Sequence, residues 1–259
     1  MNPLIPGSGA RQGLLVLALG ALSPCAVAQF LVDPVVIEMQ SRQRVAMVSV
    51  TVSPKLKAPV TLQTEVLAWK QDLGGKQVLE ETGELLVSPA IASVKPGQRQ
   101  VFRIGLRGQR SSPDEGAYRL IIEDVSEPES GSLGKEGLGV TLRIRNDLPV
   151  MIAPVGKVTT AVRWNPCPAG AAAPAGATRV PDTCVRLLNA GNRRIRVQTL
   201  TLTGDGWQQP LVPKDGGVVL AGTEREWRVP LAKNQTGAVR SVQVQTARGE
   251  TLQAEAGGF

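Results

Sequence analysis

Apolar and polar residues alternate along most of the chain in short, repeated segments. The alternation is clearest in residues 45–52, where Val48, Val50 and Val52 share one face. It appears again in residues 60–67, 101–106, 118–123 and 138–145. A period of two predicts β-strands with one buried face. Because Pro, Gly and Asp clusters separate the segments and no long amphipathic helix pattern occurs, the sequence predicts an all-β protein built of antiparallel sandwiches.

The pattern becomes less regular in the second half of the chain. Residues 150–156 combine proline and glycine and are interpreted as a junction between two domains. Shorter strand candidates follow at residues 158–164, 184–188, 194–202, 226–229 and 239–246. A hairpin-like turn is expected at residues 189–192, and residues 254–259 are expected to fray. The predicted domains are residues 29–153 and 154–259, both of ordinary domain size.

Residues 1–28 have the pattern of a secretory signal peptide. Arg11 gives a positive start, an apolar stretch follows, and Ala26 and Ala28 supply the small residues of a cleavage site. The apolar stretch is too short to span a membrane, and no later segment reaches about 18 apolar residues. We therefore expect an exported protein without membrane insertion. A lipoprotein anchor at Cys25 is an alternative that Pro24 disfavours.

Two cysteines, Cys167 and Cys184, remain after removal of this signal. In an oxidising compartment, such a pair favours a structural disulfide over a metal or redox site. The segment between them is rich in Ala, Pro and Gly, and a disulfide would stabilise the second half by restricting the unfolded chain. Two unpaired buried thiols are the alternative, and no metal site is expected.

The composition argues against catalysis and against nucleic-acid binding. The chain contains no histidine, which removes the commonest general base and the commonest metal ligand. Its net charge of +7 comes from dispersed basic residues, with Arg193-Arg194 as the longest run, and aromatic residues make up 3%. Nucleic-acid binders usually combine a basic stripe with stacking aromatic residues. We expect a non-enzymatic protein that needs no cofactor and binds no nucleic acid.

Five segments in unbroken order carry a family resemblance. In the most specific, residues 88–104, a proline-containing stretch and the turn Lys95-Pro96-Gly97 lead into a strand bearing Arg103. The other four are residues 30–34, 65–72, 118–124 and 148–150. Together they resemble the periplasmic chaperones of the chaperone–usher pathway, most closely its archaic branch. In the second half, the position, the length and the turn at residues 189–191 support the resemblance.

This resemblance implies two immunoglobulin-like β-sandwich domains set at an angle, in a periplasmic chaperone that binds pilus or fimbrial subunits. Those subunits are incomplete sandwiches that lack one strand. The chaperone fills the gap with the last strand of its first domain, and then delivers the subunit to an outer-membrane usher. The resemblance implies no enzymatic activity and no cofactor.

The donor strand of such a chaperone is expected at residues 138–144. Leu138, Val140, Leu142 and Ile144 share one face, and four evenly spaced aliphatic side chains suit binding by strand addition. From periodicity alone, the same face also fits the core of the chain's own sandwich. The resemblance favours partner binding.

The family also anchors the carboxylate at the C-terminus of the subunit with basic residues. Arginine suits this task because its planar fork binds a carboxylate through two hydrogen bonds. The candidates in this sequence are Arg103, carried by the strand after the Pro-Gly turn, and then Arg145 and Arg143. Each of them also fits a solvated surface arginine.

The chain departs from the main branch of the family at several positions. Asp33 and Pro34 stand where an arginine of the first strand is expected, and Leu148 stands near the usual lysine. Ala153 replaces an interdomain arginine, so that Asp124 lacks the salt-bridge partner expected at the hinge.

A secreted carbohydrate- or surface-binding β-sandwich module is the alternative function. It requires exposed aromatic residues on one face, and Trp164, Trp207 and Trp227 are the available set. We interpret these three, together with Trp69 and Tyr118, as core residues. An enzyme based on carboxylates is disfavoured because adjacent acidic residues on a strand point to opposite faces. A pilus subunit would need a free N-terminal arm, whereas here the strand pattern directly follows the signal.

Overall fold

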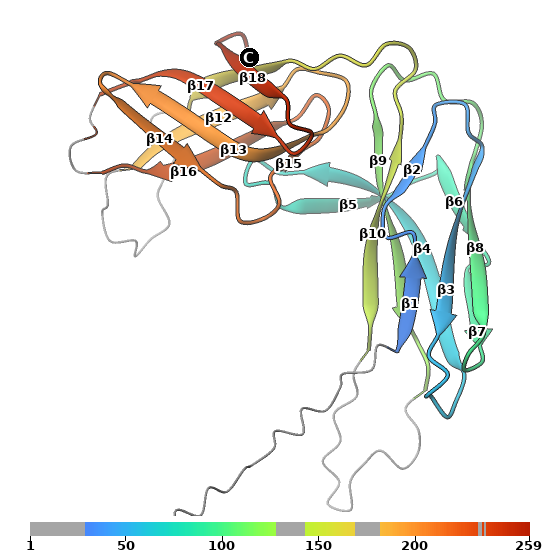
Figure 1. Ribbon diagram of the computed structural model, residues 1–259. Helices are drawn as coiled ribbons and strands as arrows, with labels where there is room; N and C mark the ends of the chain where they lie inside the picture. Colours follow the sequence, from blue (N-terminus) through green and yellow to red (C-terminus); the bar gives the residue numbers. More distant parts are fainter. Residues whose placement is uncertain (1–28, 128–142, 169–181, 233–234, 236) are drawn as a thin grey trace, which may run out of the picture.

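The computed structural model describes residues 29–127, 143–168, 182–232, 235 and 237–259. The secondary-structure elements of these described residues are all β-strands. They form two domains set at an angle (Figure 1). The prediction of an all-β protein with two immunoglobulin-like sandwiches is confirmed. Across the described part of the chain, no helix has the length and hydropathy that a membrane span requires.

The first domain is a sandwich of a four-stranded sheet and a six-stranded sheet. The order of the first is β1-β3-β8-β6; that of the second is β2-β10-β9-β4-β5, with β7 also paired to β4. Neighbouring strands are antiparallel except β2 and β10, which are parallel. The strands are β1 (Phe30–Asp33), β2 (Ile37–Met39), β3 (Val45–Val52), β4 (Val60–Gln71), β5 (Gln77–Glu81), β6 (Leu85–Ser88), β7 (Ile91–Val94), β8 (Arg99–Leu106), β9 (Gly116–Asp124) and β10 (Arg145–Ile152).

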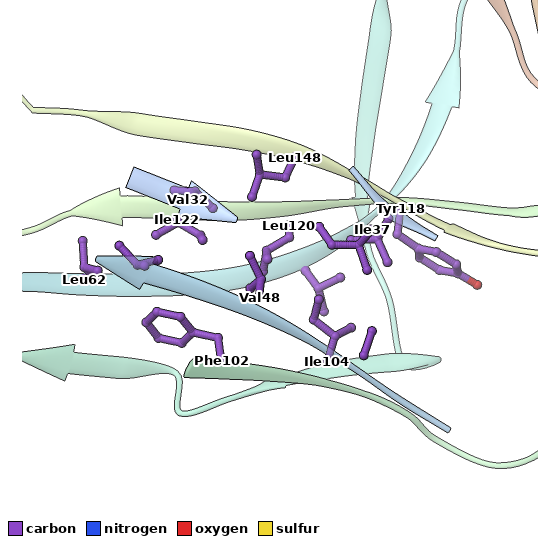
Figure 2. Close-up of a cluster of buried hydrophobic side chains, with 14 of the residues drawn as sticks. Val32, Ile37, Val48, Leu62, Phe102, Ile104, Tyr118, Leu120, Ile122 and Leu148 are labelled. Atoms are coloured by element: carbon purple, nitrogen blue, oxygen red, sulfur yellow. The ribbon is translucent and has the colours of Figure 1, made fainter. Parts of the chain in front are cut away.

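Side chains from both sheets meet in one hydrophobic core (Figure 2). Phe102 and Ile104 of β8 are fully buried, as are Leu62 of β4 and Leu120 of β9 on the opposite sheet. Arg103, between the two buried residues of β8, is exposed. The alternation read from the sequence is therefore the alternation of burial, and removal of this apolar surface from water is the main stabilising term.

The chain crosses between the two sheets at two prolines. Pro34 separates β1 from β2, Pro89 separates β6 from β7, and a cis peptide bond precedes each proline. Proline lacks the N–H that a continuing strand ladder needs. Because the first crossing ends β1 after four residues, β1 remains an edge strand that pairs with β3.

The second domain is an eight-stranded sheet around a second hydrophobic core. Its order is β14-β13-β17-β18-β11-β12-β16, with β15 paired to β13. Trp164, Trp207 and Trp227 are buried in this core, as predicted. The strands are β11 (Val162–Pro166), β12 (Asp182–Asn189), β13 (Ile195–Gly204), β14 (Trp207–Leu211), β15 (Val218–Val219), β16 (Glu224–Pro230), β17 (Val239–Thr246) and β18 (Thr251–Ala256).

A disulfide bond joins Cys167, directly after β11, to Cys184 in β12, as predicted. The two strands are antiparallel neighbours, and the Cys167 N–H donates to the Cys184 carbonyl at 3.1 Å. The disulfide therefore ties together the ends of two strands that are already paired. Glu226 lies close to both sulfur atoms, but metal binding by cysteine requires a thiolate, which a disulfide does not offer.

Three boundary predictions are wrong. β10 continues to Ile152, so the junction begins after residue 152 rather than at residue 150. Residues 189–192 do not form a hairpin, because β12 pairs with β11 and β16 whereas β13 pairs with β14, β15 and β17. Instead, the buried Asn189 amide donates to the Val219 and Leu220 carbonyls, both at 3.1 Å. At the C-terminus, β18 includes residues 254–256, and Ala254 is buried.

Candidate functional site

One side of the first-domain sandwich carries strand edges without a described neighbour. β10 pairs with β9 along its whole length. On its other edge, β2 pairs only with the last three residues of β10. The edge of residues 145–149 that faces away from β9 therefore has no strand partner among the described residues. β1, the edge strand of the opposite sheet, lies beside this part of β10 (Figures 1 and 2). The sandwich is open between β1 and β10.

Exposed apolar side chains occur in β1, in the segment between β1 and β2, and directly before β10. Leu31 of β1 is 68% exposed, and Val35 and Val36, between β1 and β2, are 63% and 45% exposed. Ile144, directly before β10, is 37% exposed. Ile144 adjoins the unpaired edge of β10, whereas Leu31 alternates with the buried Phe30 and Val32 and projects from the outer face of its sheet.

Of the four predicted donor-strand residues, the structure describes Ile144. The other three lie outside the described residues: Leu138, Val140 and Leu142. The Ile144 carbonyl accepts a hydrogen bond from the Asp124 N–H at 2.9 Å, so pairing with β9 continues past the start of β10. Ile144 is an even number of positions from the buried Leu148 and shares its side of the strand.

The three arginines predicted as carboxylate anchors are not brought together. Arg103 projects from the outer face of the four-stranded sheet, between Met47 of β3 and Ser88 of β6. Arg145 begins β10 and Arg143 precedes it. All three are exposed, and no hydrogen bond or ion pair links their side chains to other described residues.

The first contact between the domains is made by the β4–β5 hairpin, which extends towards the second domain (Figure 1). Trp69 of this hairpin packs with Met151 and Leu220 in a buried apolar cluster. Trp69 is therefore buried, as predicted, but between the domains rather than in the first-domain core. The Gln71 side chain donates to the Val218 carbonyl at 3.1 Å and accepts from the Leu220 N–H at 3.0 Å.

The tip of the same hairpin also contacts the second domain. The Leu73 carbonyl accepts a hydrogen bond from the Glu226 N–H at 2.7 Å. Gly75 has a φ of 83° and packs so closely on Arg225 that a side chain at this position would collide with the guanidinium group. The hairpin contact thus extends from its apolar base to its tip.

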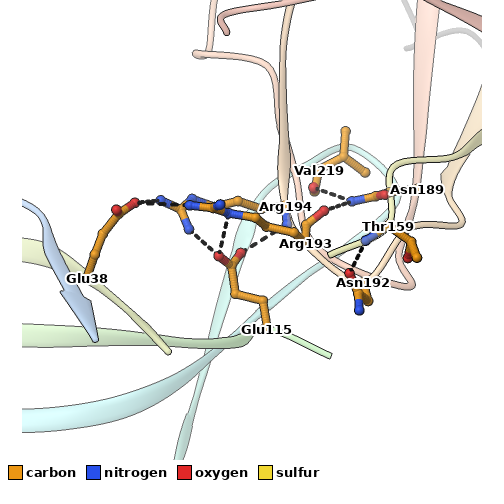
Figure 3. Close-up of polar contacts among 8 residues, drawn as sticks. All are labelled: Glu38, Glu115, Thr159, Asn189, Asn192, Arg193, Arg194 and Val219. Atoms are coloured by element: carbon orange, nitrogen blue, oxygen red, sulfur yellow. Dashed lines mark hydrogen bonds and ion pairs between the residues drawn. The ribbon is translucent and has the colours of Figure 1, made fainter. Parts of the chain in front are cut away.

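The second contact is a cluster of four charged residues (Figure 3). The carboxylate of Glu115, before β9, accepts from the Arg194 N–H at 3.0 Å and from the Arg194 guanidinium at 2.5 Å, and lies 3.5 Å from Arg193 Nε. Arg194 also pairs with Glu38 of β2. This hydrogen bond holds the pKa of Glu38 below its ordinary value, although partial burial acts in the opposite direction. The Glu115 side chain is 3% exposed, so the two arginines neutralise a buried carboxylate.

Asp124 does not take part in the hinge. Its carboxylate accepts hydrogen bonds from the Ser126 N–H at 2.9 Å and the Ser126 hydroxyl at 2.6 Å, beyond the last residue of β9. β9 approaches the second domain at its opposite end, where Gly116 follows the buried Glu115.

A pocket of about 380 Å³ lies between the two domains. Its apolar lining residues are Val36, Trp69, Pro149, Ile195, Val218 and Ala247. Its cationic lining residues are Arg119, Arg193, Arg194, Arg196 and Arg248. Glu38 and Glu250 also line it. The pocket therefore offers an apolar wall together with an excess of positive charge, a combination that suits an anionic group on an apolar ligand.

Arg119 of β9 lies across the sheet from Pro149 and is held on two sides. Its guanidinium group lies 3.7 Å from the centre of the Trp69 ring, and one nitrogen lies 3.5 Å from the Asp147 carboxylate. Burial lowers the pKa of Arg119 from its ordinary value, and Asp147 opposes this effect. The Nε atom is buried without a hydrogen-bond partner among the described residues. A buried donor without an acceptor is costly, so the position of Arg119 depends on its contacts with Trp69 and Asp147.

The sequence analysis did not identify Arg119, Arg193 or Arg194 as site residues. The pair Arg193-Arg194 stood out as the longest basic run, which was a usable signal. The partners Glu115 and Glu38 lie 79 and 156 positions from Arg194, and spacing alone does not connect residues so far apart. Arg119 carried no distinguishing signal, because a single arginine on a strand also fits a solvated surface.

Residues 29–157 match the family model described as the pili and flagellar-assembly chaperone, PapD N-terminal domain. This range contains both sheets of the first domain and the opening between β1 and β10. Through this domain, the chain belongs to the family of pilus-assembly chaperones, and the resemblance found in the sequence is confirmed. A comparison with curated proteins found no match.

Solved structures show the same fold over most of the chain. One is the CsuC–CsuE chaperone–tip adhesion subunit pre-assembly complex from archaic chaperone-usher Csu pili of Acinetobacter baumannii, at 17% identity and a TM-score of 0.61, covering 89% of this chain and 100% of that chain. The class 5 fimbriae chaperone CfaA matches at 13% identity and a TM-score of 0.58, with 89% and 100% coverage. The Salmonella enterica SafA pilin in complex with the SafB chaperone matches at 15% identity and a TM-score of 0.54, with 88% and 97% coverage.

Proposed function

We propose that the protein is a non-enzymatic periplasmic chaperone that holds pilus or fimbrial subunits by donor-strand complementation and delivers them to an outer-membrane usher. The observation that carries this proposal is the opening between β1 and β10, where an unpaired strand edge borders exposed apolar side chains. A subunit that lacks one strand would pair with such an edge through backbone hydrogen bonds. The CsuC–CsuE and SafA–SafB complexes pair a chaperone with a subunit, and likeness to them supports the same class of partner.

The proposed donor strand is the segment that leads into β10. Its proposed subunit-binding residues are Leu138, Val140, Leu142 and Ile144. Alternation along a strand gives them the same side as Leu148 and Val150, which are buried in the first-domain core. Ile144 is already 37% exposed, so this protein's own core ends at about that residue. The apolar side of the strand would then continue into the subunit.

The proposal includes an anchor for the C-terminal carboxylate of the subunit. Arg103, Arg143 and Arg145 are exposed and remain the candidates from the sequence, with Arg103 on the outer face of the other sheet. Arg119 is added as a candidate, because it lines the pocket between the domains. A chain paired along residues 145–149 of β10 would reach Pro149, which lines the same pocket as Arg119.

The alternative of a carbohydrate-binding module has less support. A sugar-stacking platform needs exposed aromatic faces, but all four tryptophans of the chain are at most 9% exposed. The single tyrosine, Tyr118, is also buried. For the periplasmic location, the signal-like residues 1–28 lie outside the described residues, and the Cys167–Cys184 disulfide is consistent with an oxidising compartment.

The donor strand is tested by co-expression with candidate subunit proteins in a bacterial periplasm. The wild type should capture a stoichiometric complex. The double variant Leu142→Glu plus Ile144→Glu should not, because ionised carboxylates are costly to bury in an apolar groove. The matched control, Gly139→Glu plus Thr141→Glu, adds the same charge on the opposite face and should retain more of the complex.

Circular dichroism of the free variants separates binding from folding. If the Leu142 and Ile144 variant unfolds, these residues belong to the protein's own core and the donor assignment is wrong. If the wild type captures no subunit at all, the chaperone proposal fails.

The carboxylate anchor is tested with Arg119→Met, Arg103→Met and Arg145→Met in the same capture assay. Loss of a charged hydrogen bond typically weakens binding by about tenfold or more. We expect this loss for Arg119→Met and near wild-type capture for the other two variants. A loss confined to Arg103→Met or Arg145→Met would place the anchor at a residue that the sequence analysis already named.

A further inference from the structure

The disulfide lies on the outer face of the second-domain sheet, beside charged side chains of the same and the next strand. Cys184 and Arg186 of β12 are partly exposed and share this face, because Val185 and Leu187, which alternate with them, are buried in the core. Glu226 of β16 is also partly exposed and lies across the sheet from Arg186. Solvent and dissolved ions therefore reach this group of side chains.

Strand pairing brings the two cysteines together independently of the covalent bond between them. β11 pairs with β12 up to Pro166, which lies opposite Val185, and the next pair in this register is Cys167 and Cys184. The Cys167 N–H donates to the Cys184 carbonyl at 3.1 Å. The two sulfur atoms would therefore stay close to each other in the reduced chain, in which each cysteine carries a thiol.

A carboxylate oxygen of Glu226 completes a group of three metal-ligand atoms. This oxygen and the sulfur atoms of Cys167 and Cys184 all lie within 4.8 Å of one another. The Arg186 guanidinium holds the Glu226 carboxylate through hydrogen bonds of 3.0 Å from Nε and 2.6 Å from a terminal nitrogen. Ligating carboxylates are usually fixed by hydrogen bonds of this kind. The carboxylate is thus positioned without any help from the sulfur atoms.

Two thiolates and one carboxylate are a donor set that suits zinc. Zn²⁺ binds thiolate sulfur at about 2.3 Å and carboxylate oxygen at about 2.0–2.2 Å in a tetrahedral arrangement. At these bond lengths the ligand atoms lie roughly 3.5–3.8 Å apart, so rotation of the side chains suffices to form the site. A water molecule would take the fourth position. Together with the Arg186 guanidinium, the three anionic ligands and Zn²⁺ have no net charge.

We propose that the reduced form of this protein binds a zinc ion through Cys167, Cys184 and Glu226, so that zinc and the disulfide are alternative cross-links between β11 and β12. An exported chain carries thiols until an oxidising compartment converts them, and the site exists during that interval. A disulfide oxidant then accepts two electrons from the two cysteines and becomes a dithiol. The zinc ion leaves as the new S–S bond forms, because the same sulfur atoms cannot serve both cross-links.

Cobalt is the probe for the test, because Co²⁺ in a tetrahedral thiolate site absorbs visible and near-ultraviolet light whereas Zn²⁺ does not. The purified protein is reduced by a trialkylphosphine and water, which yields two thiols and the phosphine oxide. Titration with Co²⁺ should then produce a sulfur-to-cobalt charge-transfer band that saturates at one ion per chain, and Zn²⁺ should abolish the band. The oxidised protein should show no band and bind zinc far more weakly. Equal zinc affinity of the oxidised and reduced forms overturns the proposal.

A matched pair of variants tests the carboxylate ligand. Glu226 and Glu224 both lie on β16 and both pair with Arg186, but of these two residues Glu226 alone belongs to the three-ligand group. Zinc affinity of the reduced protein should fall about tenfold or more in Glu226→Gln and stay close to the wild type in Glu224→Gln. Cys184→Ser should lose the charge-transfer band. An equal fall in the two glutamine variants, or an unchanged affinity in Glu226→Gln, overturns the proposal.

Repetition of the titration in urea separates a folded site from two thiols on an unfolded chain. Unfolding removes Glu226 from the cysteines, so the zinc affinity should fall about tenfold or more. Circular dichroism shows whether the reduced protein keeps its sheet without metal, and if it does not, zinc should restore the sheet because the free energy of metal binding adds to that of folding. Affinity that is unchanged by urea, or a reduced chain that stays unfolded with zinc, overturns the proposal. Subunit capture tests the proposed function separately, since these ligands lie in the second domain and β10 in the first.

Discussion

The two contacts between the domains differ in their physical character. At the hairpin contact, Trp69, Met151 and Leu220 are 7%, 2% and 5% exposed, and the Gln71 side chain makes hydrogen bonds to the backbone of Val218 and Leu220. In the ion cluster, Glu115 is 3% exposed but Glu38 is 52% exposed. The hairpin contact depends on the removal of apolar surface from water. The ion cluster depends on ion pairs whose carboxylates range from buried, at Glu115, to half exposed, at Glu38.

Because of this difference, the two contacts are expected to have different roles: one stabilises the association of the domains, and the other fixes the angle between them. Burial of apolar surface is non-directional and insensitive to salt, so the hairpin contact stabilises the association of the domains. A buried ion pair gains little net stability, because desolvation offsets the attraction between its charges, but each arginine must meet its carboxylate in one geometry. We therefore expect the hairpin contact to supply most of the free energy and the ion cluster to set the angle.

The largest effect is expected for Trp69→Ala at the hairpin contact. Loss of a buried tryptophan typically lowers the free energy of unfolding by about 4 kcal/mol. Denaturant unfolding measures it, and the control is Val78→Ala, on the same hairpin but 40% exposed, which should change stability by less than about 0.5 kcal/mol. Similar losses in the two variants would show that the apolar cluster is not the main contact.

A smaller but clear effect is expected for Glu115→Gln in the ion cluster. This change removes the buried carboxylate that Arg193 and Arg194 share and leaves Glu38 as their charged partner, at a cost of about 3 kcal/mol. Small-angle scattering should also show a wider distribution of interdomain angles than in Trp69→Phe, which keeps an aromatic ring in the apolar contact. An unchanged distribution would show that the cluster does not set the angle.

The effect of Glu38→Gln should be small, because this carboxylate is half exposed. Exposed ion pairs contribute about 0.2–1 kcal/mol, and salt screens them. The difference in unfolding free energy from the wild type should therefore shrink at high salt. A difference that persists would show that Glu38 acts through packing rather than charge.

The smallest expected effect is the pH dependence of the difference in unfolding free energy between the wild type and Glu38→Gln. The pKa of Glu38 is lower in the folded protein than its ordinary value of 4.5. Its contribution to stability is thus present above that value and is lost as pH falls through the lower, folded-state pKa. The wild type and Glu38→Gln should converge in unfolding free energy on acidification. A constant difference across this pH range would contradict the assigned cause of the shift.

The sequence predicted the longer strands of both domains better than the shorter ones for a physical reason. The pattern at residues 45–52 coincides with β3, because eight residues allow several alternations of buried and less buried positions. β2, β5, β6 and β7 of the first domain, and β14, β15 and β18 of the second, were not predicted as strands, and each has six residues or fewer. The misread turn at residues 189–192 shows the limit: local spacing indicates a change of direction but does not show which strand becomes the neighbour.

The same limit applies to the candidate site. The donor strand was readable because its residues are consecutive and alternate, although three of the four lie outside the described residues. The pocket was not readable, because Arg119, Val36 and Val218 come from three distant segments that meet only when the two domains associate. The spacing of residues in the sequence predicts which side chains share a face of one strand. It does not predict which distant segments pack together to form a pocket.

The positions of the aromatic residues give the molecule a built-in optical reporter. Three of the four tryptophans lie in the second-domain core, whereas Trp69 lies at the contact between the domains. Tyr118, the single tyrosine, pairs across the sheet with Ala68, the neighbour of Trp69. In a variant with phenylalanine at the other three positions, energy transfer from Tyr118 to Trp69 would report that the first domain is intact. A red shift of Trp69 emission would report that the domains have separated, so one fluorescence spectrum would distinguish hinge opening from unfolding.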